Sequence, residues 1–156
     1  MGLQKHHASS NSNEGSVFIS KWETPLGDVL RHLNDLFYLQ GTCFARLSTI
    51  KKLAQEKYPG KYSPESRVLV DIIRDCVVKI SAEFGNDPKY SRDAKYLELI
   101  VKGVSCRVAS ETLGLSREHT SRHVRREALR LLVHQFVQTV HNKKNGVNEK
   151  IPSLVS

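Results

Sequence analysis

The sequence predicts an all-α fold. Apolar residues recur at spacings of three and four along most of the chain, which is the period of one face of a helix. Two segments, Thr24-Pro25 and Ser63-Pro64, pair a capping residue with a proline suited to the first helical position. No segment combines the two-residue alternation of a strand with the turn chemistry of a hairpin. A length of 156 residues allows one domain or two very small ones.

Three helices are expected in a helical N-terminal region, residues 21–85. The first runs from Thr24-Pro25 to Gly41, and its inward residues are Leu26, Val29, Leu30, Leu33, Leu36 and Phe37. The second covers about residues 42–58 and stops at Pro59-Gly60. The third begins at Ser63-Pro64, closes at Gly85, and has the most regular apolar face: Leu69, Ile72, Ile73, Cys76, Val77, Ile80 and Phe84. Residues 1–20, rich in Ser, Asn, His and Gly, are expected to be a flexible tail.

A second helical region, residues 86–141, follows the linker Asn86-Asp87-Pro88. One helix should run from Ser91 to the break at Gly103, and a short one from about residue 105 to 113. Gly114-Leu115-Ser116 turns the chain, and a long helix should then reach His141. Residues 142–156 are expected to form a second flexible tail.

Positive charge is concentrated in the second half of the chain. The whole sequence carries a net charge of +8, and residues 86–156 hold 13 basic and 7 acidic side chains. A basic half beside a nearly neutral half indicates an anionic partner for the C-terminal part. The competing interpretation is a protein that is basic without a functional reason.

The cysteines and the hydropathy indicate an intracellular, cytoplasmic protein. Cys43, Cys76 and Cys106 are odd in number and too far apart for a compact metal pattern, so all three are expected to be reduced and structural. The apolar runs are only a few residues long, which predicts no membrane span. The N-terminus has no apolar signal core. No cofactor is expected, because the chain lacks a Gly-rich phosphate loop.

Residues 106–125 have the requirements of two helices joined by a tight turn. Ser110 is a small residue where the second helix must cross the first, and Gly114 tolerates the positive φ that the turn needs. Leu115 can pin the turn to the core, and Ser116 can cap the second helix. This pattern predicts a helix-turn-helix, whose second helix enters the major groove of DNA.

The segment YLELIVKGVSCRVASETLGLSREHTSRHVRREALRLL resembles region 4 of sigma-70-type transcription factors and the related LuxR-type helix-turn-helix. LGLSRE is similar to the sigma turn, EALRLL to the helix that follows it, and SRHVRR to the LuxR-type version. The resemblance covers about residues 90–136 and implies DNA binding and transcription regulation. Two departures stand out: Thr120 replaces the usual Val or Ile, and the spacing from the turn to EALRLL is one residue longer. Nothing upstream resembles sigma region 2.

Helical geometry divides the second helix into two faces. The residues expected to face the protein are Thr120, Val124, Ala128 and Leu131. Arg117, Ser121 and Arg125 repeat every fourth residue on an exposed face, with Glu118 and Arg122 beside them. Arginine can pair bidentately with guanine, and Glu118 can accept from the cytosine amino group. We expect phosphate contacts from Ser116, Arg107 and Arg126.

Other interpretations of this segment are weaker. His119 and His123 lie one turn apart, but no third ligand or zinc-protease pattern accompanies them. RNA binding is disfavoured because the basic patch has only Phe136 as an aromatic. Arginines stabilised by pairs such as Glu118–Arg122 could also be a merely solvated face. An enzyme is disfavoured because no paired carboxylates or activated nucleophile are visible.

The partners beyond double-stranded DNA are open at this stage. Residues 21–85 could support the DNA-binding part, bind a protein partner or a second copy, or hold a ligand. Because sigma region 4 also binds RNA polymerase, the resemblance implies an alternative: a stand-alone module that binds RNA polymerase. The apolar stripe of the last helix could pack on the N-terminal helices or form a homodimer: Leu132, Val133, Phe136, Val137 and Val140.

Overall fold

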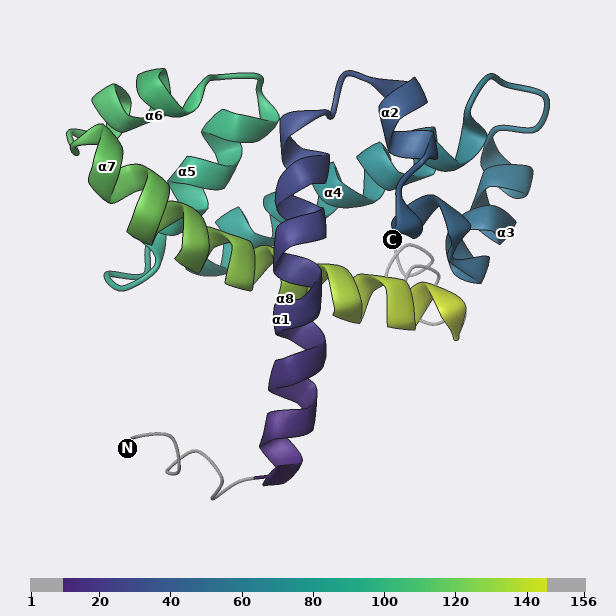
Figure 1. Ribbon diagram of the computed structural model, residues 1–156, viewed down its shortest axis with the longest axis horizontal. Coiled ribbons are helices and arrows are strands. Elements are labelled where there is room, and N and C mark those ends of the chain that lie inside the picture. Colours follow the sequence, from purple (N-terminus) through teal and green to yellow (C-terminus); the bar gives the residue numbers. More distant parts are fainter. Residues whose placement is uncertain (1–9, 146–156) are drawn as a thin grey trace.

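The computed structural model describes residues 10–145, and it describes the side chains of residues 21–145. This part of the chain contains helices and no strand, which confirms the predicted all-α class (Figure 1). The two long core helices are α4 (Pro64–Phe84) and α8 (Arg125–Lys144), and α4 packs against α3 (Ser48–Lys57), α5 (Ser91–Val101) and α8. A bilayer would need a longer run of apolar helix than any that residues 10–145 provide.

Helix α4 has the start, the end and the buried face that the sequence predicts. Pro64 occupies its first turn, and Gly85 donates its N–H to the carbonyl of Ser81 at the other end. Leu69, Ile73 and Cys76 are fully buried. Ser63 precedes the helix in the left-handed region, at φ 47, and its side chain makes no capping hydrogen bond. The proline therefore sets the helix start here, and the predicted serine cap is absent.

Helix α1 (Ser10–Arg31) crosses α8 near the middle of the molecule, and its N-terminal part extends away from the body (Figure 1). Two side chains of α8 pack directly against α1 at Gly27, which is buried. A Cβ at this position would lie 3.1 Å from a terminal nitrogen of Arg125 and 3.3 Å from Cδ1 of Leu129. Glycine therefore makes room for both side chains at the crossing.

An aromatic cluster of three rings joins elements that are distant in sequence. Trp22 of α1, Phe44 of the 3-10 helix η2 (Cys43–Arg46) and Phe136 of α8 meet edge to face. Their ring centroids are 5.2 to 5.6 Å apart, within the range that aromatic pairs prefer. Phe136, Leu132 and Val133 are fully buried in this chain's own core. These three residues of the apolar stripe on α8 therefore pack within this chain's own core, and they are not exposed for pairing with the same helix of a second copy.

The start of α1 corrects two expectations. The helix begins at Ser10, so residues 10–20 are helical and do not belong to a flexible tail; residues 1–9 lie outside the described residues. Pro25 lies inside the helix, where it removes the N–H that would bond to the carbonyl of Lys21. The helix continues because Leu26 and Val29 are fully buried, and burial supplies most of a helix's stability in a protein.

The segment predicted as one helix up to Gly41 is two helices. α1 ends at Arg31, and α2 covers Leu36–Gln40 after a turn. Asp35 starts α2 by accepting a hydrogen bond from the N–H of Tyr38 at 3.0 Å. The turn changes the direction of the chain, so Phe37, predicted to face inward, is 76% exposed. The next predicted helix is likewise divided, into η2 and α3.

The C-terminal half follows the predicted boundaries more closely. α5 spans Ser91–Val101 and α6 spans Cys106–Leu113. The predicted long helix begins as α7 (Arg117–His119), continues as the π-helical segment η3 (Thr120–Val124) and ends as α8. Residues 142–144, expected in a tail, belong to α8, while residues 146–156 lie outside the described residues. One hydrophobic core includes residues from both sides of the predicted boundary at residue 86.

Gly27→Val should lower the free energy of unfolding by roughly 1–3 kcal/mol, because the added side chain overpacks the crossing of α1 and α8. Thermal or urea denaturation measures this change. Gly41→Val is the matched control, since a Cβ at Gly41 would meet only a backbone oxygen at 3.5 Å. Equal stability of the two variants would show that the crossing is looser than described.

Candidate nucleic-acid interface

Helices α6 (Cys106–Leu113) and α7 (Arg117–His119) are joined by a tight turn, and a serine caps the start of each helix; the sequence predicts only the cap at Ser116. The Ser105 hydroxyl accepts a hydrogen bond from the N–H of Val108 at 3.2 Å at the start of α6. Gly114 adopts φ 72 and ψ 29, the left-handed conformation that the turn requires. The Ser116 hydroxyl accepts from the N–H of His119 at 3.0 Å and so caps α7. We call residues 105–124 the paired-helix unit.

Small and partly buried residues hold the paired-helix unit against the core. Ala109 is fully buried, and Ser110 is 2% exposed. The Ser110 hydroxyl donates to the carbonyl of Cys106 at 2.8 Å, and the Ser110 carbonyl accepts from the N–H of Leu115 at 3.0 Å. Leu115 is partly buried and packs on the core. The left-handed conformation of Gly114 and the cap at Ser116 are therefore as predicted, and Ser110 and Leu115 both contribute to the packing beside the turn.

A π-helical segment lies in the middle of the second helix. In η3 the N–H of Arg125 bonds to the carbonyl of Thr120, five residues earlier, instead of four. A wider turn of this kind accommodates one extra residue within the helix. Thr120 is fully buried, and its hydroxyl donates to the carbonyl of Ser116 at 3.0 Å. Thr120 can therefore face the apolar core, because this hydrogen bond satisfies its hydroxyl group.

The predicted contact residues lie on the paired-helix unit and at its junction with α8. Seven of the eight are exposed: Arg107, Ser116, Arg117, Glu118, Ser121, Arg122 and Arg126. Thr120, Val124 and Ala128 face the core and are fully buried, as predicted, while Leu131 is partly buried. The division into an inner and an outer face therefore holds through the π-helical segment.

Two of the exposed arginines form ion pairs within their own helix. Arg107 lies 3.3 Å from Glu111, and Arg122 lies 3.4 Å from Glu118, with both members of the second pair 70% exposed. Exposed pairs of this kind contribute at most about 1 kcal/mol, so a stronger anionic partner can replace them. Arg117 and Arg126 have no ion-pair partner within residues 21–145.

Arg125 differs from the other predicted contact residues because it is half-buried. Its guanidinium lies beside Gly27 at the α1–α8 crossing. It has neither a hydrogen bond nor an ion pair to another residue of the described part of the chain. Arg125 therefore does not lie on the open outer face with Arg122, and it points instead into a groove between α1 and the paired-helix unit.

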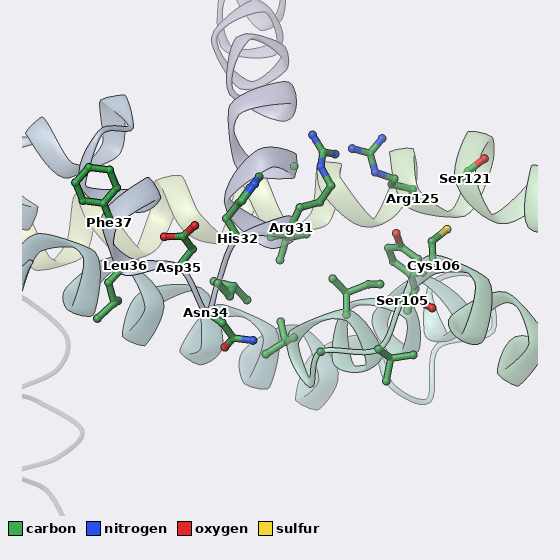
Figure 2. A pocket seen from close by; sticks show the side chains of 18 of the residues that line it. Arg31, His32, Asn34, Asp35, Leu36, Phe37, Ser105, Cys106, Ser121 and Arg125 are labelled. Atoms are coloured by element: carbon green, nitrogen blue, oxygen red, sulfur yellow. The ribbon is translucent and has the colours of Figure 1, made fainter.

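This groove has a volume of about 1110 Å³ and is lined by the end of α1, the following turn, α5 and the second helix of the paired-helix unit (Figure 2). Arg117, Ser121 and Arg125 contribute to it from one side. Arg31 and Tyr96 contribute from α1 and α5, and sequence reasoning did not select either one. One feature of the sequence could have indicated that α1 lies beside the helix of Arg125. Gly27 is a glycine within an apolar helical face, which is typical of a close helix crossing.

Burial raises the pKa of Tyr96 to about 12, and the neighbouring thiol of Cys106 acts in the same direction. The charges of Arg125 and Arg31 oppose this rise, which places both guanidinium groups within electrostatic range of the phenol. Tyr96 is therefore a neutral hydroxyl at physiological pH, able to donate a hydrogen bond into the groove.

The two histidines of the segment face each other without forming a metal site. The rings of His119 and His123 are 5.0 Å apart between centroids. Within the described residues, no group of three or more His, Cys, Asp or Glu side chains is placed to hold a metal ion. The three cysteines are free; Cys76 is buried, Cys106 is half-buried, and Cys43 is exposed, contrary to a purely structural role for all three.

The chain has no match among protein-family models, curated proteins or solved structures. Its possible functions therefore have to be argued from the geometry of the paired-helix unit and the charges around it.

A buried carboxyl group lies at the start of α5, close to α8. Asp93 is 2% exposed, and its Oδ1 has no hydrogen-bond partner within the described residues. Burial raises the pKa of Asp93 above its ordinary value; the positive charge of Arg92, 3.9 Å away, lowers it, and the negative charge of Glu127 raises it further. The folded protein therefore keeps a proton on this carboxyl that the unfolded chain loses at lower pH.

Asp93→Asn should make stability less dependent on pH. In the wild type, the free energy of unfolding should fall as the pH rises above 3.8, because the unfolded chain ionises Asp93 there while the folded chain resists ionisation. Urea denaturation across a pH series measures this slope. Asp75→Asn is the control, since Asp75 is exposed and pairs with Lys79 at 3.3 Å. A wild-type slope that survives in Asp93→Asn would contradict this account.

Proposed function

We propose that this chain is a cytoplasmic, non-enzymatic DNA-binding protein that regulates transcription. In this proposal the paired-helix unit is a helix-turn-helix, and α7 with η3 enters the major groove of double-stranded DNA. One observation carries the proposal. Two capped helices are joined by a turn at a glycine, and the second helix has an exposed cationic face. The resemblance to sigma region 4 and LuxR-type motifs supports the same function.

The open face has the side chains needed to read base edges. Arg117 and Arg122 are exposed guanidinium groups that can each donate two hydrogen bonds to guanine. Glu118 can accept from the amino group of cytosine once its ion pair with Arg122 opens. Ser121 is exposed one turn further along and can donate to either kind of base.

The flanking positions are suited to the phosphate backbone. Ser116 stands at the N-terminus of α7, where the helix dipole and its own hydroxyl favour an anion. Arg107 on α6 and Arg126 at the start of α8 are exposed on either side of the reading face. Contacts of this kind position the protein on DNA and make its binding dependent on salt. Arg125 lies apart from this set, because it is directed into the groove.

Arginine substitutions on the two parts of the interface should have different effects. Arg117→Ala and Arg122→Ala should each weaken binding to a preferred duplex by about 1–3 kcal/mol and relax its sequence preference. Arg126→Ala should weaken binding to all duplexes similarly and reduce the dependence of log affinity on log salt by about 1. Fluorescence anisotropy with a labelled preferred duplex and a scrambled duplex, at several salt concentrations, measures both.

Arg74→Ala is the charge-matched control, because Arg74 is exposed on α4 outside the paired-helix unit. It removes one positive charge and should leave the affinity close to that of the wild type. If Arg117→Ala and Arg122→Ala bind DNA as tightly as Arg74→Ala does, the reading face is wrongly assigned.

A further inference from the structure

The groove beside the paired-helix unit has the dimensions of a small-molecule site. Its volume of about 1110 Å³ is slightly above the usual range for ligand pockets, roughly 300–1,000 Å³. Its walls come from α1, α5 and the second helix of the paired-helix unit, so it joins the N-terminal helices to the proposed reading helix (Figure 2).

One end of the groove is cationic. Figure 2 shows the guanidinium groups of Arg31 and Arg125 directed toward the same space from α1 and α8. Arg31 is paired with Asp28, whereas Arg125 has no carboxylate to neutralise it within residues 21–145. Two like charges held at one end of a partly enclosed groove repel each other, and an anion between them converts this repulsion into two attractions.

Hydroxyl groups lie beside these cations. Tyr96 and Ser121 both line the groove near Arg125. The Tyr96 phenol stays neutral at physiological pH, so it can donate a hydrogen bond to an anion without adding a negative charge of its own. The cationic end thus supplies both charge and directed donors, which is the combination that binds carboxylate, phosphate and sulfonate groups.

The rest of the groove has both apolar and polar walls, and its polar lining includes His32, Asn34 and Asp35. Leu30, Leu33, Ile100, Val101 and Val104 line it from α1, the turn after α1, α5 and the turn after α5. Ile100, Val101 and Val104 are only partly buried, so apolar surface is still in contact with water. An inorganic anion would leave that surface wet, whereas a hydrocarbon or aromatic body attached to the anion would cover it.

We propose that this groove binds a small organic anion, with its acidic group between Arg31 and Arg125 and its apolar body against Leu30, Ile100 and Val104. The site shares Arg117, Ser121 and Arg125 with the second helix of the paired-helix unit. A bound anion therefore attracts side chains of that helix toward the groove and lowers the affinity for DNA. The loss of DNA affinity rests on the proposed DNA-binding function, whereas the binding of the anion in the groove does not.

The ligand site is tested first without DNA, using two dyes that differ in one group. Anilinonaphthalene sulfonate carries an anion on an aromatic body, and phenylnaphthylamine is its neutral counterpart. Fluorescence titration of the folded full-length chain should show the sulfonate binding at least about tenfold more tightly, since a hydrogen bond to a charged group contributes about 1.5–3 kcal/mol. Equal affinity for both dyes would overturn the proposal.

Variants at the cationic end locate the bound sulfonate. Arg125→Gln and Arg31→Gln should each weaken sulfonate binding about tenfold. Arg31 is exposed, so its substitution leaves the packing at Gly27 intact and keeps the test valid if Arg125→Gln folds poorly. Arg74→Gln, on α4, removes the same charge outside the groove and should have no effect. A weakening in Arg74→Gln equal to that in Arg31→Gln would overturn the proposal.

The free cysteines give a second readout within one chain. Cys106 lines the groove, and Cys43 is exposed outside it. Saturation with the sulfonate should slow the alkylation of Cys106 by iodoacetamide at least about threefold and leave that of Cys43 unchanged, as measured by peptide mass spectrometry. Unchanged alkylation of both thiols at saturation would place the dye elsewhere and overturn the site.

A DNA titration with and without the sulfonate then tests the coupling. The affinity for a preferred duplex should fall about as many fold as the sulfonate's affinity falls when DNA is bound, because coupling between two sites is reciprocal. Dye binding without any DNA binding would remove the proposed function and leave the ligand site standing. DNA binding without dye binding would remove the ligand site and leave the function standing.

Discussion

The close crossing of α1 over α8 at Gly27 is the contact on which the arrangement of the two halves depends. The absence of a side chain at Gly27 lets Leu129 and Arg125 pack directly against α1. One turn before Gly27, Trp22 of the same helix meets Phe44 and Phe136, so the crossing is continuous with the aromatic cluster. Because α8 continues the helix that starts at Arg117, this contact connects α1 to the same continuous helix that forms the second half of the paired-helix unit.

The same crossing separates the arginines of the second helix into two groups. Arg117 and Arg122 are exposed, although Arg117 also lines the groove, whereas Arg125 is half-buried and held beside α1. Arg117, Ser121 and Arg125 line the same groove, so they share one face as their four-residue repeat predicts, and the π-helical segment lies between Arg117 and Arg125. The open group is suited to DNA, and the enclosed one is suited to a smaller anion. The proposed function and the proposed ligand site therefore follow from one packing arrangement.

The sequence predicted what depends on local chemistry. The start of α4 at Pro64, the left-handed turn at Gly114 and the cap at Ser116 each rest on one residue's conformational preference, and the structure confirms all three. It did not predict that the helix begins before Pro25, because burial of the helix outweighs the missing N–H there. It also did not predict the groove, whose walls lie far apart in the chain and meet only through tertiary packing.

The central claim is that the open face of the paired-helix unit reads DNA sequence. Selection from a random-sequence duplex pool, followed by sequencing and performed at two salt concentrations, tests it most directly. The account predicts an enriched motif that persists at the higher salt, because contacts to base edges discriminate between sequences while phosphate contacts weaken. Binding that disappears at the higher salt and leaves no enriched motif would contradict sequence reading by this face. It would show that these arginines attract DNA only as a polyanion, without regard to its sequence.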